Sequence, residues 1–137
     1  MTIIEAPQYD TVFFDLDGTL LPIDMDVFLG AYFKRLGQFV TERGFESDKI
    51  IAAVNAGVRS MLSDDPRLNE ECFWETFEQM TGEDREAFDP LVMEFYGTAF
   101  DELGEMVTPN PAAARIVEVL KYKGYQLFLT TMPLFPR

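Results

Sequence analysis

Hydrophobic positions along the chain follow two different patterns. Between about residues 22 and 106, apolar side chains recur three and four positions apart, which is typical of amphipathic helices. Short unbroken apolar runs before and after this region are typical of strands that are buried on both faces. The pattern therefore predicts a long helical segment between two strands.

The first half of the helical segment has clear start and stop signals. Asp24 is a plausible N-cap for a first helix, and Gly44 is a plausible end. A second helix is expected to begin near Ser47 and to break at the loop over residues 63–66. The apolar stripe of the first helix contains Met25, Phe28, Leu29, Tyr32, Phe33, Leu36, Phe39 and Val40.

Two further helices are predicted in the second half of this segment. Asn69 can cap the third helix, which would end at Gly82. The fourth is expected to open where Pro90 follows Asp89, since proline suits the first helical position. Cys72 lies in the third helix, where a packing thiol is the expected role.

The first apolar run, Thr11–Phe14, leads directly into the motif Asp-x-Asp-Gly-Thr. Side chains two residues apart in an extended segment point the same way, so Asp15 and Asp17 can share one small site. Gly18 permits a sharp turn and a close approach of backbone amides to a ligand. Ligands of open parallel sheets bind at the carboxyl ends of strands, which is where this pair is expected.

The core pattern returns near residue 107. Asn110 is expected to cap a helix that has Pro111 as its first residue and ends at Gly124. The residues of this helix that are expected to face inward are Ile116, Val117, Val119 and Leu120. A second buried strand over residues 125–129 then ends in two adjacent hydroxyl residues, Thr130 and Thr131.

Composition restricts the classes of function. The chain has 137 residues, a formal net charge of −13 and no histidine, which excludes Ser-His-Asp triads and His-ligated zinc. The negative charge argues against nucleic acid or an anionic membrane as a partner. A single cysteine, no apolar run long enough to span a membrane and no signal-peptide pattern favour a soluble, cytoplasmic protein.

Two neighbouring aspartates suit a divalent cation, because Mg²⁺ takes hard oxygen ligands. They also suit a division of labour in which one carboxylate is a nucleophile and the other is an acid and base. The bland alternative is a solvated acidic turn after a core strand. A phospho-accepting receiver domain also uses such a cluster, but it has no long helical insertion after its first strand.

The run from Thr11 to Leu20 resembles the first motif of the haloacid dehalogenase (HAD) superfamily, whose members are mostly Mg²⁺-dependent phosphohydrolases. The resemblance implies that Asp15 attacks phosphorus and becomes an aspartyl phosphate. Asp17 would protonate the leaving group and activate water, and both residues would contact Mg²⁺, Asp17 through its main-chain carbonyl. Gly18, Thr130 and Thr131 would hold the phosphoryl group of a small phosphorylated metabolite.

The resemblance also implies a division of the chain. Residues 1–21 and 107–137 would form part of a Rossmann-like α/β core with a parallel sheet, and residues 22–106 an inserted all-helical cap. The family's third and fourth motifs, a cation and further metal-binding acids, have no counterpart before Arg137. We therefore expect a truncated product, or one piece of a site that another polypeptide completes, and we expect the 137-residue chain alone to be inactive.

An incomplete core has a consequence for the sheet, and it leaves an alternative function open. Without the family's later strands, residues 12–14 would present an unpaired apolar edge that a partner chain would have to cover. The alternative to the phosphohydrolase, from a different functional class, is a catalytically silent fragment that acts as a binding or assembly module.

Overall fold

The structure is a computed structural model that describes residues 9–132. Within this range the chain is mixed α/β and mostly helical, with five α-helices, one 3-10 helix and two strands. It divides into two compact units. Residues 9–25 and 107–132 form the first, which we call the α/β unit, and residues 26–106 form the second, which we call the helical unit.

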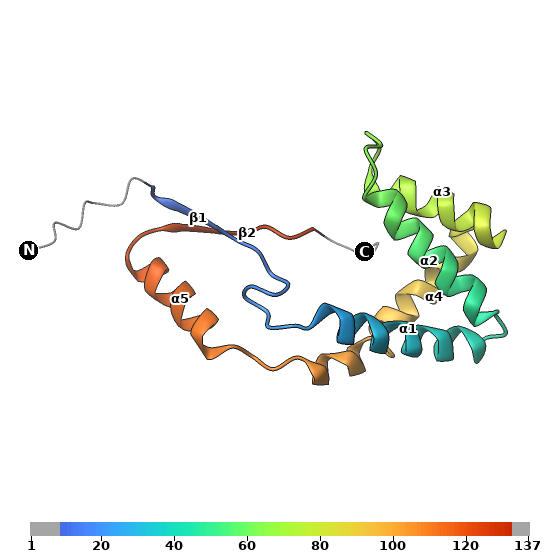
Figure 1. Cartoon of the computed structure of the whole chain (residues 1–137), viewed down its shortest axis with the longest axis horizontal. Helices are drawn as coiled ribbons and strands as arrows, with labels where there is room; N and C mark the ends of the chain where they lie inside the picture. The colour runs from blue at the N-terminus through green and yellow to red at the C-terminus, as the bar shows by residue number, and fades with distance from the viewer. Residues whose placement is uncertain (1–8, 133–137) are drawn as a thin grey trace, which may run out of the picture. The chain divides into compact units, whose positions relative to one another are not determined.

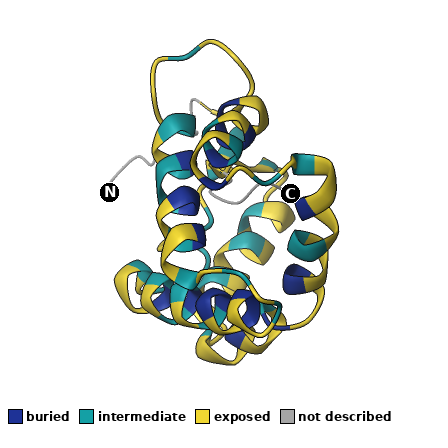
Figure 2. Cartoon of the chain, turned by 90° about the vertical axis from the view of Figure 1, so that its right-hand side faces the viewer, coloured by how far each residue is buried: buried dark blue, intermediate teal, exposed yellow. Residues whose placement is uncertain are grey.

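The helical unit is built from consecutive helices (Figure 1). Buried and exposed positions alternate along each of them, as expected for amphipathic helices (Figure 2). In the part of the chain that the structure describes, no helix is long and apolar enough to cross a membrane. The elements are α1 (Met25–Thr41), α2 (Ser47–Met61), α3 (Asn69–Thr81), α4 (Arg85–Gly97) and the 3-10 helix η1 (Asp101–Met106).

Aromatic side chains form the core of the helical unit. Phe95 of α4 lies with its ring centroid 5.7 Å from Tyr32 and 5.2 Å from Phe39, both of α1. Phe77 of α3 lies 4.8 Å from Phe88 of α4. Such edge-on and tilted pairs bury large apolar area and add specific ring contacts. All buried hydrophobic residues among those described lie between Phe28 and Leu103.

Several predicted helix limits are confirmed. The second helix starts at Ser47, and the third ends at Thr81 with Gly82 as its C-cap, in a left-handed conformation with φ of 74°. This conformation favours glycine, because glycine has no Cβ atom. Cys72 is buried with 2% exposure, as expected for a packing thiol.

Two helix starts were predicted wrongly. Asn69 is the first residue of α3 rather than its cap, and Leu68 occupies the cap position. The side chain of Glu71 accepts a hydrogen bond from the Leu68 amide at 3.0 Å, which is the contribution that a glutamate at the third helical position makes to a capping box. Helix α4 begins at Arg85, five residues before Pro90.

The early start of α4 has a local cause. The carboxylate of Asp84 accepts a hydrogen bond from the amide of Glu86 at 2.8 Å, which makes Asp84 the N-cap. Pro90 therefore lies inside the helix, where it lacks the amide that would bond to the preceding turn.

The α/β unit contains β1 (Thr11–Phe14), α5 (Pro111–Tyr122) and β2 (Gln126–Leu129). The two strands pair in parallel, with Thr11 opposite Gln126 and Phe14 opposite Leu129. Helix α5 begins as predicted, because the Asn110 side chain accepts a hydrogen bond from the Ala112 amide at 3.0 Å. The described sheet has only these two strands, which lie side by side in Figure 1.

The predicted burial of the α/β unit is wrong within the described residues. Phe13 of β1 is 65% exposed and Phe128 of β2 is 49% exposed, although their rings stack at 5.2 Å. Ile116 and Val119 of α5 are 50% and 44% exposed, and α5 has no buried residue. The physical reason is the small size of the described sheet, since two strands of four residues offer too little apolar surface for α5 and the strands to bury their side chains against one another. A Rossmann-like core with a helical cap stays a prediction.

Candidate functional site

The two predicted site segments meet at the carboxyl ends of the paired strands. Phe14 and Leu129 form the last register pair, so Asp15 and Thr130 follow directly at the same edge. The amide of Thr130 donates a hydrogen bond to the carbonyl of Phe14 at 2.7 Å, which extends the ladder by one bond. The parallel register therefore brings together residues that are more than one hundred positions apart in the sequence.

A tight loop turns the chain immediately after Asp15. The amides of Thr19 and Leu21 both donate to the carbonyl of Leu16, at 3.1 and 2.9 Å. The amide of Gly18 donates to the carbonyl of Leu21 at 2.9 Å, and Gly18 has a φ of 73°. The predicted sharp turn at Gly18 is thus present, and its amide serves the loop itself in this conformation.

The exposure of the site residues differs. Asp15, Gly18, Thr130 and Thr131 are exposed, whereas Asp17 is half-buried. Residues 9–25 contain four aspartates and neither lysine nor arginine. A phosphoryl group brought to this edge would be repelled by the local carboxylates unless a cation were present.

Thr130 has its hydroxyl turned toward the main chain. Its Oγ1 atom donates a hydrogen bond to the carbonyl of Phe14 at 3.2 Å. A threonine hydroxyl carries one proton, so this proton is not available to a ligand in the same conformation. Rotation of the side chain would free it, while the oxygen lone pairs remain accessible. The phosphate-binding role of Thr130 stays a prediction.

The acidic side chains near the strand ends determine how a metal ion could be bound there. Within residues 9–132, no group of three or more His, Cys, Asp or Glu residues could hold a metal ion. Asp15 and Asp17 supply oxygen donors from one loop, and Mg²⁺ is commonly bound by one or two carboxylates together with water and substrate phosphate. The residues present therefore fit a weak Mg²⁺ site in which water or phosphate supplies the other ligands.

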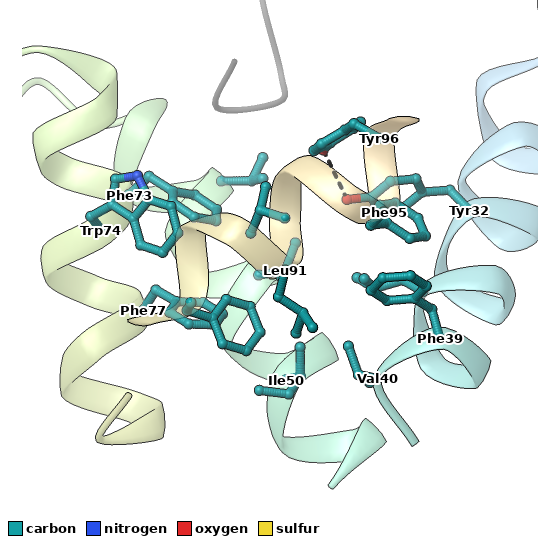
Figure 3. Close-up of a pocket in the computed structure, with 15 residues that line it drawn as sticks. Tyr32, Phe39, Val40, Ile50, Phe73, Trp74, Phe77, Leu91, Phe95 and Tyr96 are labelled. Carbon is teal, nitrogen blue, oxygen red and sulfur yellow. Dashed lines mark hydrogen bonds between the residues drawn. The ribbon is translucent and has the colours of Figure 1, made fainter. Parts of the chain in front are cut away.

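Sequence reasoning missed one feature of the helical unit. An apolar cavity of about 40 Å³ lies between two groups of aromatic side chains, with Phe73 and Trp74 on one side and Phe95 on the other (Figure 3). The hydroxyl groups of Tyr32 and Tyr96 lie 3.2 Å apart at its edge. Burial raises the pKa of Tyr32 to about 12, and the hydrogen bond with Tyr96 opposes part of that rise.

Comparison with known proteins adds no further assignment. No family model matches the chain, and no curated protein or solved structure matches it significantly. A functional interpretation therefore depends on the residues at the strand ends and on their geometry.

Proposed function

We propose that the protein is a Mg²⁺-dependent phosphohydrolase that acts on a small phosphorylated metabolite through an aspartyl-phosphate intermediate. One observation carries the proposal. The strands β1 and β2 pair in parallel and in register, and the segments that begin at Asp15 and Thr130 follow directly from their carboxyl ends. A nucleophilic carboxylate and hydroxyl-bearing residues at one strand-end edge are two of the parts that a phosphoryl-transfer site with a covalent aspartyl intermediate uses.

The proposed reaction has two steps. A carboxylate oxygen of Asp15 attacks phosphorus and forms an O–P bond, while the bond to the leaving oxygen breaks and Asp17 gives that oxygen a proton. Asp17 then takes a proton from water as the water oxygen attacks phosphorus, which releases inorganic phosphate and restores the Asp15 carboxylate. Positioned acid–base groups of this kind contribute roughly 10²- to 10⁴-fold each.

Charge is the main difficulty for this reaction, because the site segment is acidic. Mg²⁺, when bound by Asp15 and the main chain or side chain of Asp17, would neutralise charge on the phosphoryl oxygens. Gly18, Thr130 and Thr131 would orient those oxygens. For Thr130 this requires its hydroxyl to turn away from the carbonyl of Phe14.

The proposed architecture extends to the rest of the chain. Residues 1–21 and 107–137 would belong to a Rossmann-like core, and residues 22–106 would form its helical cap. The exposed ring of Phe13 and the two-stranded sheet support the further proposal that additional protein covers the free edge of β1.

A second candidate function is a silent binding or assembly module. One observation supports it. Large apolar side chains of the α/β unit are exposed. In that case the acidic loop would be a solvated turn, and the surface of the α/β unit would be the functional part.

Two measurements separate these candidates. Phosphate release from small phosphomonoesters is measured with Mg²⁺ and after its chelation, in the wild type and in Asp64→Asn, a control at an exposed loop residue. In parallel, amide resonances of Gly18 and Thr130 are followed on addition of Mg²⁺ with beryllofluoride, a phosphoryl mimic. The proposal expects shifts at both amides that Asp15→Asn abolishes. Unchanged resonances would favour the silent module, and Mg²⁺-dependent release would favour the enzyme. Absence of release from the 137-residue chain alone is expected for both candidates.

A further inference from the structure

The apolar cavity of the helical unit has walls that resist collapse. On one side, the rings of Phe73 and Phe77 stack with their centroids 5.9 Å apart. A Cβ atom added at Gly57 of α2 would come within 2.6 Å of Phe73, so this ring already rests on the main chain of α2. On the other side, Phe95 packs against Phe39 at 5.2 Å. Rings packed against their neighbours cannot shift far, and a space of about 40 Å³ stays unfilled between them.

Solvent reaches the lining of this cavity between α2 and α4. Fifteen of the described side chains line the cavity, and twelve of them are buried. The other three, Val58 of α2 and Leu91 and Val92 of α4, are half-buried. Leu91 lies between the two groups of rings in Figure 3. We call these three half-buried side chains the entrance.

Helix α4 is weakened beside the entrance. Pro90 lies inside the helix and directly precedes Leu91 and Val92. Because proline has no amide hydrogen, the helical hydrogen bond from residue 90 to the carbonyl of residue 86 is absent. This turn of α4 therefore has one hydrogen bond fewer to break than an ordinary helical turn when it moves to admit a ligand.

The lining of the cavity favours an apolar guest. Its polar groups are the indole nitrogen of Trp74 and the hydroxyls of Tyr32 and Tyr96, and the two hydroxyls lie 3.2 Å apart at the edge. Cavities with so few polar partners exclude water and accept apolar atoms. The volume of about 40 Å³ exceeds the roughly 30 Å³ that one water molecule takes in the liquid. It therefore suits the last one or two carbon atoms of an alkyl chain.

Charge around the cavity restricts the rest of the ligand. The helical unit, residues 26–106, contains 18 acidic and 7 basic residues. Asp89, which directly precedes Pro90, is exposed beside the entrance. A carboxylate or phosphate group held outside the entrance would be repelled by this excess of negative charge.

We propose that the helical unit binds the end of an alkyl chain that belongs to a small molecule without negative charge. The chain enters between α2 and α4, its terminal carbons fill the cavity, and its head group stays in solvent. Each methylene group that leaves water for the apolar lining strengthens binding about fourfold. The proposal is independent of the chemistry at Asp15, because every residue that it uses belongs to the helical unit.

The test uses the fluorescence of Trp74, which is the only tryptophan of the chain and lines the cavity. The probe is 6-bromohexan-1-ol, since a bromine atom at the chain end quenches indole fluorescence on contact. Titrated into the 137-residue chain, it should quench Trp74 along a saturable curve. The carboxylate 6-bromohexanoate should bind about tenfold more weakly, because its head group is repelled. Equal binding of the two probes would contradict the charge requirement.

Two matched substitutions locate the site. Leu91→Phe places a larger ring at the entrance and should weaken binding of the probe about tenfold or more, equivalent to about two buried methylene groups. Leu62→Phe is the same substitution at an exposed residue of the helical unit that does not line the cavity, and it should leave binding within about threefold of the wild type. Circular dichroism checks that each variant is folded, and Val58→Leu replaces Leu91→Phe if that variant is not.

Three outcomes would overturn the proposal. The first is quenching of the wild type that rises in proportion to probe concentration without saturation, as in random collision. The second is a variant at the entrance that binds the probe as tightly as the wild type. The third is an equal loss of binding in Leu62→Phe and in the entrance variant, which would place the probe outside the cavity.

Discussion

The helical unit and the α/β unit differ in how much apolar area they bury. Every buried hydrophobic residue among those described belongs to the helical unit. In the α/β unit, by contrast, Phe13, Ile116 and Phe128 are 65%, 50% and 49% exposed. The candidate site nevertheless lies in the α/β unit, at the ends of a two-stranded sheet. The residues proposed for chemistry therefore belong to the unit that buries less apolar area, which is expected to contribute less to stability.

The largest expected effect concerns activity and leaves the helical unit unchanged. In any form of the protein that hydrolyses phosphomonoesters, Asp15→Asn should lower Mg²⁺-dependent phosphate release by ten-thousand-fold or more, about 5.5 kcal/mol of transition-state stabilisation, because an amide is a poor nucleophile. Thermal unfolding of the helical unit should not shift. Retention of more than about a tenth of wild-type activity would contradict the nucleophile assignment.

A second substitution in the same loop separates acid–base chemistry from metal binding. Asp17→Asn should lower turnover by about 10²- to 10⁴-fold, since proton transfer to the leaving group and from water would fail. The Mg²⁺ dependence of the remaining activity should change little, because the main-chain carbonyl stays in place. Loss of Mg²⁺ affinity at unchanged turnover under saturating metal would instead make the Asp17 side chain a ligand.

A pair of phenylalanine substitutions tests the comparison of stability directly. Phe77→Ala, at a ring with 1% exposure, should lower the free energy of unfolding by about 3–5 kcal/mol. Phe13→Ala, at a ring with 65% exposure, should lower it by less than about 1 kcal/mol. Denaturant unfolding followed by far-ultraviolet circular dichroism, which detects helices and strands of both units, measures both. Equal losses would show that the α/β unit is covered more fully than the exposure of Phe13 indicates.

The buried hydroxyl pair predicts a dependence on pH that is confined to the helical unit. The pKa of Tyr32 is about 12 in the folded chain and 10.0 in its ordinary environment. The unfolded chain therefore loses this proton first, and stability should fall as pH rises from 10 to 12. The loss is on the order of 2–3 kcal/mol. Tyr32→Phe should flatten the curve in that window; an unchanged slope would assign the loss to other groups.

Local features of the fold could be predicted from the sequence where local chemistry decides them. The strand Thr11–Phe14, the cap at Asn110 and the turn at Gly82 each depend on neighbouring residues, and all three occur as predicted. The predicted start of the fourth helix at Pro90 is wrong, because Asp84, an equally good cap, lies earlier in the chain. Two local signals competed, and the sequence pattern alone did not rank them.

Features that depend on distant parts of the chain could not be predicted from the pattern of neighbouring residues. The exposure of Phe13 follows from the number of strands in the sheet, which a strand's own composition does not contain. The contact of Tyr32 with Tyr96 joins residues 64 positions apart. For the candidate site, the sequence indicated strand-end positions for Asp15 and Thr130, and the register places both there, whereas their roles in catalysis stay predictions.

The central claim is that Asp15, at the end of β1, accepts a phosphoryl group. Its most direct test is mass spectrometry of the chain after incubation with Mg²⁺ and acetyl phosphate, followed by borohydride reduction, which converts an aspartyl phosphate to homoserine. We expect homoserine at position 15 in any form of the protein that hydrolyses phosphomonoesters and in its Asp64→Asn variant, and none in its Asp15→Asn variant. Modification at another aspartate, or none in any form of the protein that hydrolyses phosphomonoesters, would contradict it.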